Sequence, residues 1–269
     1  MSYLFAKPSY PLSSFVKQYW AIENCLPDGD VHVQRIVPTG LTDLTFYMGN
    51  KPKSLDENKD IQEDSILSGQ QKEYYDIVIS GRLCMFSISL LPHGARMFFD
   101  LPSIEFFDQN IPLKYLVKDK INELETNLYE AESFNERIKV AEDFLMNQLH
   151  KTGKLYELKR IQHSIDLINN SSGKITIEDL ASAACLSRKQ FERTFSNYIG
   201  SSPKQFLKAV KFQYSLYQKY SNRAMSLTEI AYSSGYYDQS HMINAYKSLS
   251  GITPSQYFAE CEPHSDYFM

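Results

Sequence analysis

The C-terminal part of this sequence repeats itself, and this repetition limits what the chain can fold into more than any other feature. Three segments recur about 50 residues further on. The matching pairs are residues 176–181 with 226–231, 186–195 with 237–246, and 200–203 with 251–254. Repeats of this length build solenoids or propellers only when three or more copies stack together. Two copies therefore predict a pair of related subdomains.

Each copy predicts a short helix, a tight turn and a second helix, followed by the start of a third. A hydroxyl or carboxylate that can cap a helix stands at each expected helix start, in most cases three residues before a carboxylate or amide. The expected capping residues are Thr176, Ser187, Ser202, Ser226, Asp238 and Thr253. Pro203 and Pro254 follow two of them at the first helical position, where a missing amide donor costs nothing.

The second helix of each copy has a narrow apolar stripe and a polar remainder. Phe191 and Phe195 are four residues apart in the first copy, and Met242 and Tyr246 repeat that spacing in the second. This spacing predicts that the four side chains are core residues on one face of their helices. Two interpretations of the polar remainder stay open on these patterns alone. The helices are either solvated amphipathic helices or recognition helices that enter DNA grooves.

The repeated segments also contain motifs of a known family. These motifs are Leu180-Ala181, Leu186-Ser187, Phe191-x-Arg193-x-Phe195, Gly200-x-Ser202-Pro203, Ile230-Ala231, Gly235-Tyr236, Asp238-x-Ser240, Tyr246-Lys247 and Gly251-x-Thr253-Pro254. Together they resemble the DNA-binding domain of the AraC/XylS family of bacterial transcription regulators, over about 100 of the 269 residues. The resemblance implies an all-α domain of seven helices over residues 155–260, in which a long helix joins two helix-turn-helix units. It also implies sequence-specific binding of double-stranded DNA, with RNA polymerase as a further partner.

The resemblance also indicates which side chains face DNA. In the first recognition helix these are Arg188, Lys189, Glu192 and Arg193, and in the second they are Gln239, Ser240, His241, Asn244 and Lys247. Three positions depart from the family pattern. Cys185 replaces the turn glycine, Ser215 replaces an alanine of the linker helix, and Asn244 stands where arginine is common. Because the first set includes Arg193, whose guanidinium can bind guanine in two bonds, we expect the first helix to dominate recognition.

The first 150 residues predict a β-rich domain followed by two helices, which makes the fold class α+β. Leu12 to Trp20 predicts a short helix that runs into a strand. The other expected strands are residues 31–37, 41–47, 66–69, 76–80 and 85–91. So many strands in so short a stretch indicate either a β-barrel or a sandwich. We therefore expect domains at 1–150 and 155–260, a linker at 151–154 and a frayed tail at 261–269.

Short motifs in this half resemble the N-terminal domain of one AraC-like subgroup. They are Tyr19-Trp20, Ile36-x-Pro38-x-Gly40, Asp43-Leu44 and Pro92-x-Gly94. The resemblance implies a domain that binds a small-molecule effector, mediates dimerisation, or both. Apolar stripes along residues 113–128 and 134–149 suggest a homodimer interface, although the same stripes can pack on the β-rich domain.

Charge and cysteine usage set further limits. Residues 155–260 contain 12 Lys and Arg against 8 Asp and Glu, whereas residues 1–154 contain 16 against 22. The positive charge therefore lies in the helix-turn-helix half, as nucleic-acid binding requires. The four cysteines lack any C-x-x-C spacing, which fits a reducing cytosol. With no export signal and no long apolar run, we expect a soluble bacterial cytoplasmic protein without a membrane partner.

Motifs for catalysis or for a bound cofactor do not occur in the sequence. The histidines show no metal-ligand spacing, and we find neither G-x-S-x-G nor a glycine-rich phosphate loop. We therefore expect a regulator that is not an enzyme and has no catalytic residues, metal or cofactor. Arg35, Asp43 and Arg82 lie near strand ends, where they either line a ligand pocket or form surface salt bridges. The alternative function is a cupin-like metal-binding or enzymatic domain fused to a helix-turn-helix module.

Overall fold

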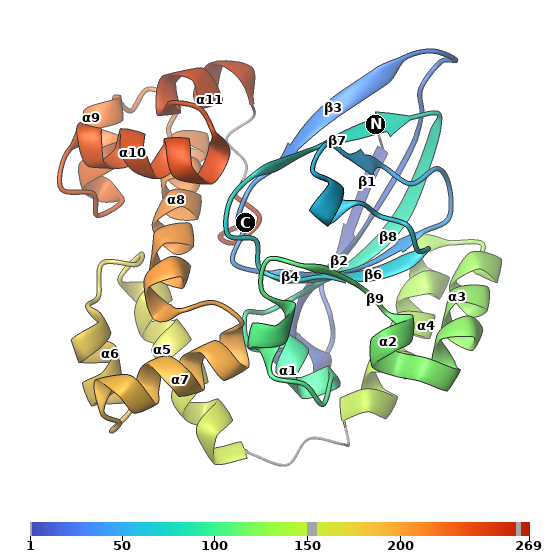
Figure 1. The fold of residues 1–269 in the computed structure, drawn as a ribbon, viewed down its shortest axis with the longest axis horizontal. Helices are drawn as coiled ribbons and strands as arrows, with labels where there is room; N and C mark the ends of the chain where they lie inside the picture. Colours follow the sequence, from blue (N-terminus) through green and yellow to red (C-terminus); the bar gives the residue numbers. More distant parts are fainter. Residues whose placement is uncertain (1, 150–154, 262–264) are drawn as a thin grey trace.

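The chain folds into a β-rich half and a helical half that lie side by side (Figure 1). The structure is a computed structural model and describes residues 2–149, 155–261 and 265–269. The expected linker at 151–154 lies outside the described residues. The two halves are in direct contact along the long helix of the helical half, where the Gln213 side chain donates to the carbonyl of Pro38.

The β-rich half contains two antiparallel sheets. Six strands pair in the order β1-β2-β8-β4-β6-β9, and three pair in the order β3-β7-β5. The strands are β1 Ser2–Ala6, β2 Val16–Cys25, β3 Val31–Ile36, β4 Thr42–Tyr47, β5 Lys53–Ser54, β6 Ser65–Ser68, β7 Tyr75–Ser80, β8 Arg82–Leu90 and β9 Asn110–Pro112. The described strands thus form two separate sheets, and of the two architectures left open by the sequence the structure adopts the sandwich-like one.

Side chains along β8 alternate between the two faces of the larger sheet. Phe86, Ile88 and Leu90 are fully buried in the main core, whereas Ser87 and Ser89 point to the opposite face. The five predicted strands are all present, as is the short helix η1 (Leu12–Ser14) ahead of β2. Three of the described strands were not predicted: β1, the two-residue β5, and the three-residue β9, which includes a proline. Pairing with β2, β7 and β6, respectively, makes these segments strands, since none of them has a clear hydrophobic period of its own.

The helices of the β-rich half pack against the larger sheet. The α-helices are α1 Ala95–Phe98, α2 Lys114–Val117, α3 Ile121–Glu130 and α4 Phe134–Leu149, and the other 3-10 helices are η2 Glu57–Lys59, η3 Ser103–Phe106 and η4 Lys118–Lys120. Leu124 and Leu128 of α3 and Leu145 of α4 are buried in the same core as Phe86. The apolar stripes of these helices therefore serve the core of the β-rich half, which is the second of the two roles expected for them.

The helical half has the seven helices expected for residues 155–260. They are α5 Leu155–Asn170, α6 Ile177–Ala183, α7 Arg188–Ile199, α8 Pro203–Ser221, α9 Leu227–Ser233, α10 Gln239–Ser250 and α11 Pro254–Glu260. Figure 1 shows α8 running between two groups of helices, with α7 at one end and α10 at the other. Each group has a core of its own, and α8 contributes Phe206 to the first and Phe212 to the second.

The expectation of a frayed tail is wrong for residues 265–269. The hydroxyl of Tyr267 donates to the Asn169 side chain at 2.8 Å, and its ring is buried beside Phe206. The Ser265 hydroxyl is fully buried and donates to the side-chain oxygen of Gln213 at 3.0 Å. The tail lacks a helical or strand period, but Tyr267 packs against Phe206 and Phe268 packs against Tyr214, and burial of this kind has no periodic pattern.

Candidate nucleic-acid interface

The turns of the two helix-turn-helix units have the same hydrogen bonds. The amide of Cys185 donates to Ser182 O at 2.9 Å in the first unit, and the amide of Gly235 donates to Tyr232 O at 3.2 Å in the second. Cys185 has a φ of 53° and Gly235 a φ of 76°, so both are in the left-handed region. Cys185, which stands where the family has a turn glycine, thus adopts the same left-handed conformation with a side chain. Such a conformation is strained for a residue with a Cβ atom.

The expected helix caps are all formed. Each capping side chain accepts a hydrogen bond from the backbone amide three residues further on, at Asp179, Gln190, Gln205, Glu229, His241 and Gln256. In four of the six, the side chain of that third residue also binds the backbone of the capping residue, which completes a capping box. Short helices such as α6 and α9 are marginal by themselves, so these caps fix where they begin.

The apolar stripes of the recognition helices face inwards, as predicted. Phe191 and Phe195 of α7 and Met242 and Tyr246 of α10 are fully buried. The Tyr246 hydroxyl pairs with the buried hydroxyl of Ser215 at 2.7 Å, so the serine that replaces an alanine in α8 is satisfied. With this face used for packing, the opposite face of each recognition helix is left for solvent or a partner.

The three cations of the first recognition helix differ in their surroundings. Arg188 forms ion pairs with Glu178 and with Glu192, the latter at 3.0 Å, and these hold its guanidinium on the protein surface. Lys189 and Arg193 are exposed, and neither forms an ion pair with another described residue. The face therefore presents Lys189 and Arg193 as free cations, while Arg188 braces the unit between α6 and α7.

The second recognition helix exposes Ser240, Asn244 and Lys247 along one line at spacings of four and three residues. The other two predicted residues take part in local contacts. His241 Nδ1 accepts from the amide of Tyr237 at 3.3 Å, and the Gln239 side chain accepts from the Thr228 hydroxyl at 3.4 Å.

Tyr237 was not among the predicted site residues, yet its side chain is 85% exposed beside the first turn of α10. Tyr237 corresponds in the repeat to Leu186 of the first unit, which is half-buried. The repeat therefore did not indicate that this position is exposed. An exposed hydroxyl at this place is suited to donate to a phosphate.

The two recognition helices are arranged alike with respect to the rest of the molecule. Their C-terminal ends adjoin the β-rich half, since Gly200 after α7 lies against Ser103 and Ser250 of α10 accepts from Arg35. Figure 1 shows that α6 and α9 lie on the side away from the sheets. The exposed faces of α7 and α10 are therefore left uncovered by the β-rich half.

The three residues predicted as ligand-binding do not come together. Arg35 forms a two-bond ion pair with Asp76 at 2.8 and 2.9 Å. Arg82 is exposed at the start of β8 and pairs with Glu23. Asp43 lies on β4 opposite the other end of β8, and its carboxylate accepts from the Ser89 hydroxyl at 2.5 Å. Desolvation by burial raises the pKa of Asp43 to about 6.

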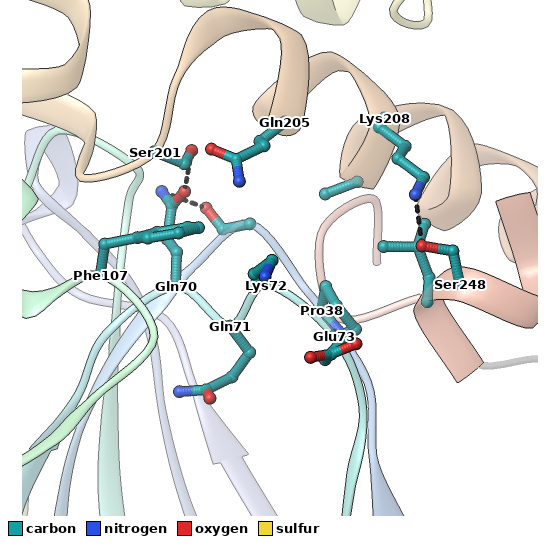
Figure 2. A pocket seen from close by; sticks show the side chains of 13 residues that line it. Pro38, Gln70, Gln71, Lys72, Glu73, Phe107, Ser201, Gln205, Lys208 and Ser248 are labelled. Atoms are coloured by element: carbon teal, nitrogen blue, oxygen red, sulfur yellow. Dashed lines mark hydrogen bonds between the residues drawn. The ribbon is translucent and has the colours of Figure 1, made fainter. Parts of the chain in front are cut away.

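A small hollow of 130 Å³ lies between the two halves (Figure 2). Pro38, Gln70 and Lys72 line it from the β-rich half, and Ser201 and Lys208 line it from the helical half. Arg35, Asp43 and Arg82 are not among its lining residues. A second hollow of 290 Å³ lies between α3 and α4.

Over residues 2–149, 155–261 and 265–269, no group of three or more His, Cys, Asp or Glu side chains is placed to hold a metal ion. Within the same ranges, no helix combines the length and apolar character that crossing a membrane requires.

Two family models match the chain. Residues 5–112 match a domain of unknown function (DUF6597), and residues 180–260 match a helix-turn-helix domain. An uncharacterized HTH-type transcriptional regulator of Haemophilus influenzae is 31% identical over 116 residues, which are 42% of this chain and 39% of the relative. The HTH-type transcriptional regulator MtrA of Neisseria gonorrhoeae is 30% identical over 110 residues, which are 40% of this chain and 36% of the relative. The matches thus span well under half of the curated relatives.

A solved structure resembles the chain over both halves. ToxT from Vibrio cholerae matches with a TM-score of 0.50 and 14% identity, over 90% of this chain and 98% of that one. At this identity the likeness concerns the fold, and it includes the order of a β-rich half followed by a helical half. Residues 180–260 are therefore a helix-turn-helix domain of the AraC type.

Proposed function

We propose that this protein is a transcription regulator that binds double-stranded DNA sequence-specifically through α7 and α10. The observation that carries the proposal is the pair of helix-turn-helix units, each of which buries its apolar stripe and exposes its polar face. The match of residues 180–260 to a helix-turn-helix domain supports it, as do the names of the curated relatives.

The two recognition helices would enter successive major grooves on one side of the duplex. Sites one helical turn apart are separated by roughly 34–36 Å, which is the geometry that helix-turn-helix pairs use. In this role Arg193 reads a guanine, because a guanidinium binds O6 and N7 in two bonds. Asn244 is suited to adenine, and Lys189 and Lys247 are suited to phosphates. Tyr237 adds a phosphate contact beside the second helix.

Electrostatics favour the helical half as the side that meets DNA. Residues 155–260 have an excess of four positive charges, with 12 Lys and Arg against 8 Asp and Glu. Residues 1–154 have an excess of six negative charges, with 16 against 22. A charge separation of this kind orients the molecule towards the polyanion and keeps the β-rich half away from it.

The β-rich half is the regulatory part in this proposal. It contacts both helix-turn-helix units, so an effector bound there or a second copy docked there would act on the DNA-binding half. The proposal includes a homodimer, RNA polymerase as a partner, a cytoplasmic location and no enzymatic activity.

The proposal is tested by selecting duplexes from a randomised library with the full-length protein and then titrating the enriched duplex. Arg193→Ala is expected to weaken binding of that duplex by roughly 5–150-fold, the equivalent of about 1–3 kcal/mol for one bidentate contact. Lys139→Ala, which removes an exposed cation from α4 in the β-rich half, is the control. A selection that enriches no sequence would refute the proposal, and so would equal losses for the two variants.

A further inference from the structure

The end of β3 and the loop that joins it to β4 contact both helix-turn-helix units and α8 of the helical half. We call residues 35–41 the bridging segment. It includes the motif Ile36-x-Pro38-x-Gly40, which the sequence marks but the DNA-binding proposal does not use. Its first residue contacts the second helix-turn-helix unit, its middle contacts α8, and its last residue is buried in the core of the first unit.

At the second unit, the contact is made by Arg35 and by Tyr74 of the β-rich half. Arg35 Nη1 donates to the carbonyl of Ser250, the last residue of α10, at 3.0 Å. The rest of the guanidinium is held by Asp76 and by the Tyr74 ring, whose centroid is 4.6 Å from Arg35 Cζ. The Tyr74 ring also packs on Gly251, where a Cβ atom would lie 2.4 Å from ring atom Cζ. The end of α10 is thus held by two side chains.

At the middle of α8, the contact is a buried amide. Gln213 is 1% exposed, and its Nε2 donates to the carbonyl of Pro38 at 2.9 Å. Its oxygen accepts from the Ser265 hydroxyl, so the amide is satisfied from two sides. A buried polar pair of this kind fixes the register of two surfaces, because sliding either surface leaves a buried group without its partner.

At the first unit, the contact runs through Gln70 (Figure 2). Its Nε2 donates to the carbonyl of Gly40 at 3.0 Å, and its oxygen accepts from the Ser201 hydroxyl at 2.6 Å. Gly40 has a φ of 79°, and a Cβ there would lie 3.4 Å from the Phe206 ring. Leu41 is 3% exposed inside the core of the first unit. The left-handed backbone at position 40 therefore favours glycine, whereas the distance to Phe206 is an ordinary contact.

The contacts at the two ends fall on equivalent positions of the repeat. Gly200 and Gly251 each follow a recognition helix, with φ values of 98° and 77°. Ser103 O lies 3.0 Å from where a Cβ would stand on Gly200, just as Tyr74 lies against Gly251. The β-rich half therefore holds both recognition helices at the same point, their C-terminal ends.

We infer that the bridging segment, with Gln70 and Tyr74, positions the two recognition helices relative to each other. The β-rich half would then set which spacing of two half-sites the protein accepts, and any movement of the bridging segment would change that spacing. The positional part stands on the contacts alone, whereas the consequence for DNA rests on the proposed function.

The positional part is tested without DNA by measuring a distance in the full-length protein. Spin labels are placed at the exposed positions Ser182→Cys on α6 and Tyr232→Cys on α9. The other accessible or partly accessible thiols are replaced by serine, namely Cys25, Cys185 and Cys261. The parent is expected to give one narrow distance distribution, because both units are held.

The released variant combines Arg35→Ala with Tyr74→Ala, which removes the contacts at α10 and leaves the helical cores intact. It is expected to give a broader or shifted distribution. Arg82→Ala with Tyr129→Ala is the matched control, since it removes an exposed arginine and an exposed tyrosine elsewhere in the β-rich half. The fluorescence of Trp20, the one tryptophan in the sequence, reports that the β-rich half is folded.

Gln70→Ala is a second released variant, at the other unit. If both released variants reproduce the distribution of the parent, α8 alone sets the distance and the inference is wrong.

The consequence for DNA is tested by inserting one base pair between the half-sites of the enriched duplex. The insertion adds about 3.4 Å and turns one half-site by about 35°. The parent is expected to lose at least about tenfold more affinity than the variant with Arg35→Ala and Tyr74→Ala. Equal losses alongside a changed distance would refute the DNA consequence. A selection that enriches no duplex would refute the proposed function and leave the distance result standing.

Discussion

Asp43 allows a test of how much stability a buried carboxylate costs in the β-rich half. The carboxylate accepts from the Ser89 hydroxyl at 2.5 Å, and Trp20 Nε1 donates to the same hydroxyl oxygen at 3.1 Å. Burial is the main cause that raises the pKa of Asp43 from 3.8 to about 6, and the charge of Asp266 adds to it. The hydrogen bond from Ser89 acts in the opposite direction and does not cancel the effect of burial. At neutral pH the folded chain therefore carries a carboxylate in an unfavourable place.

The size of the effect follows from the difference between the two pKa values. A pKa raised by about 2 units in the folded state corresponds to about 3 kcal/mol of lost stability once the group is ionised in both states. Because the folded state binds more protons between pH 4 and 6, the contribution of Asp43 to stability falls as the pH rises through that window. Asp43→Asn removes the charge and keeps an oxygen for Ser89. The variant is therefore expected to be more stable than the parent at pH 8 by up to about 3 kcal/mol.

The measurement is urea unfolding followed by the fluorescence of Trp20, which donates to the same Ser89 hydroxyl that donates to Asp43. The stability gain of Asp43→Asn should shrink as the pH falls and level off below about pH 4, where the carboxylate is protonated in both states. Asp28→Asn, at an exposed loop position, is the control for loss of a charge. A difference between variant and parent that stays constant from pH 4 to pH 8 would refute the reasoning, whatever its sign.

Four further predictions concern the helical half. Phe195→Ala should lower the free energy of unfolding by about 3–5 kcal/mol in chemical unfolding, because the ring is fully buried beside Phe206. A loss below about 1 kcal/mol would contradict this packing. Cys185→Gly should raise stability by about 0.5–1 kcal/mol, since relief of left-handed strain exceeds the added entropy of the unfolded chain, and thermal unfolding checks its sign. Arg193→Ala should weaken binding of the enriched duplex more than Asn244→Ala at matched salt; an equal or larger loss for Asn244→Ala would show that α7 does not dominate. Lys247→Ala should lower affinity evenly across sequences and reduce the slope of log affinity against log salt by about 1, and an unchanged slope would exclude a phosphate contact.

The helical half was predictable because its determinants are local. A cap such as Ser187 binds an amide three residues away, and the stripe of Phe191 and Phe195 spans one turn. Such features appear within a window of a few residues, so helix starts and buried faces follow from the sequence. The exposed predicted positions, Arg193 and Asn244, follow from the same periodicity, although their contacts with DNA remain predictions.

The surroundings of the charged residues in the β-rich half were not predictable, because they depend on distant parts of the chain. Arg35 pairs with Asp76, 41 positions away, and with Ser250, 215 positions away. From its place near a strand end, Arg35 was expected either to line a ligand pocket or to form a surface salt bridge, and the sequence did not identify a partner. The fold instead uses the guanidinium to join a β-strand to a recognition helix, which no local pattern indicates.

Gln213 couples two contacts of α8, one with the bridging segment and one with the C-terminal tail. Its amide donates to Pro38 O and accepts from Ser265, so one buried side chain ties α8 to the bridging segment and to the tail. Neither partner alone would satisfy the amide, and a buried amide left half satisfied is costly. Residues 265–269 and the bridging segment are therefore expected to be ordered together. Any signal that displaces one should loosen the other and, through it, the hold on α10.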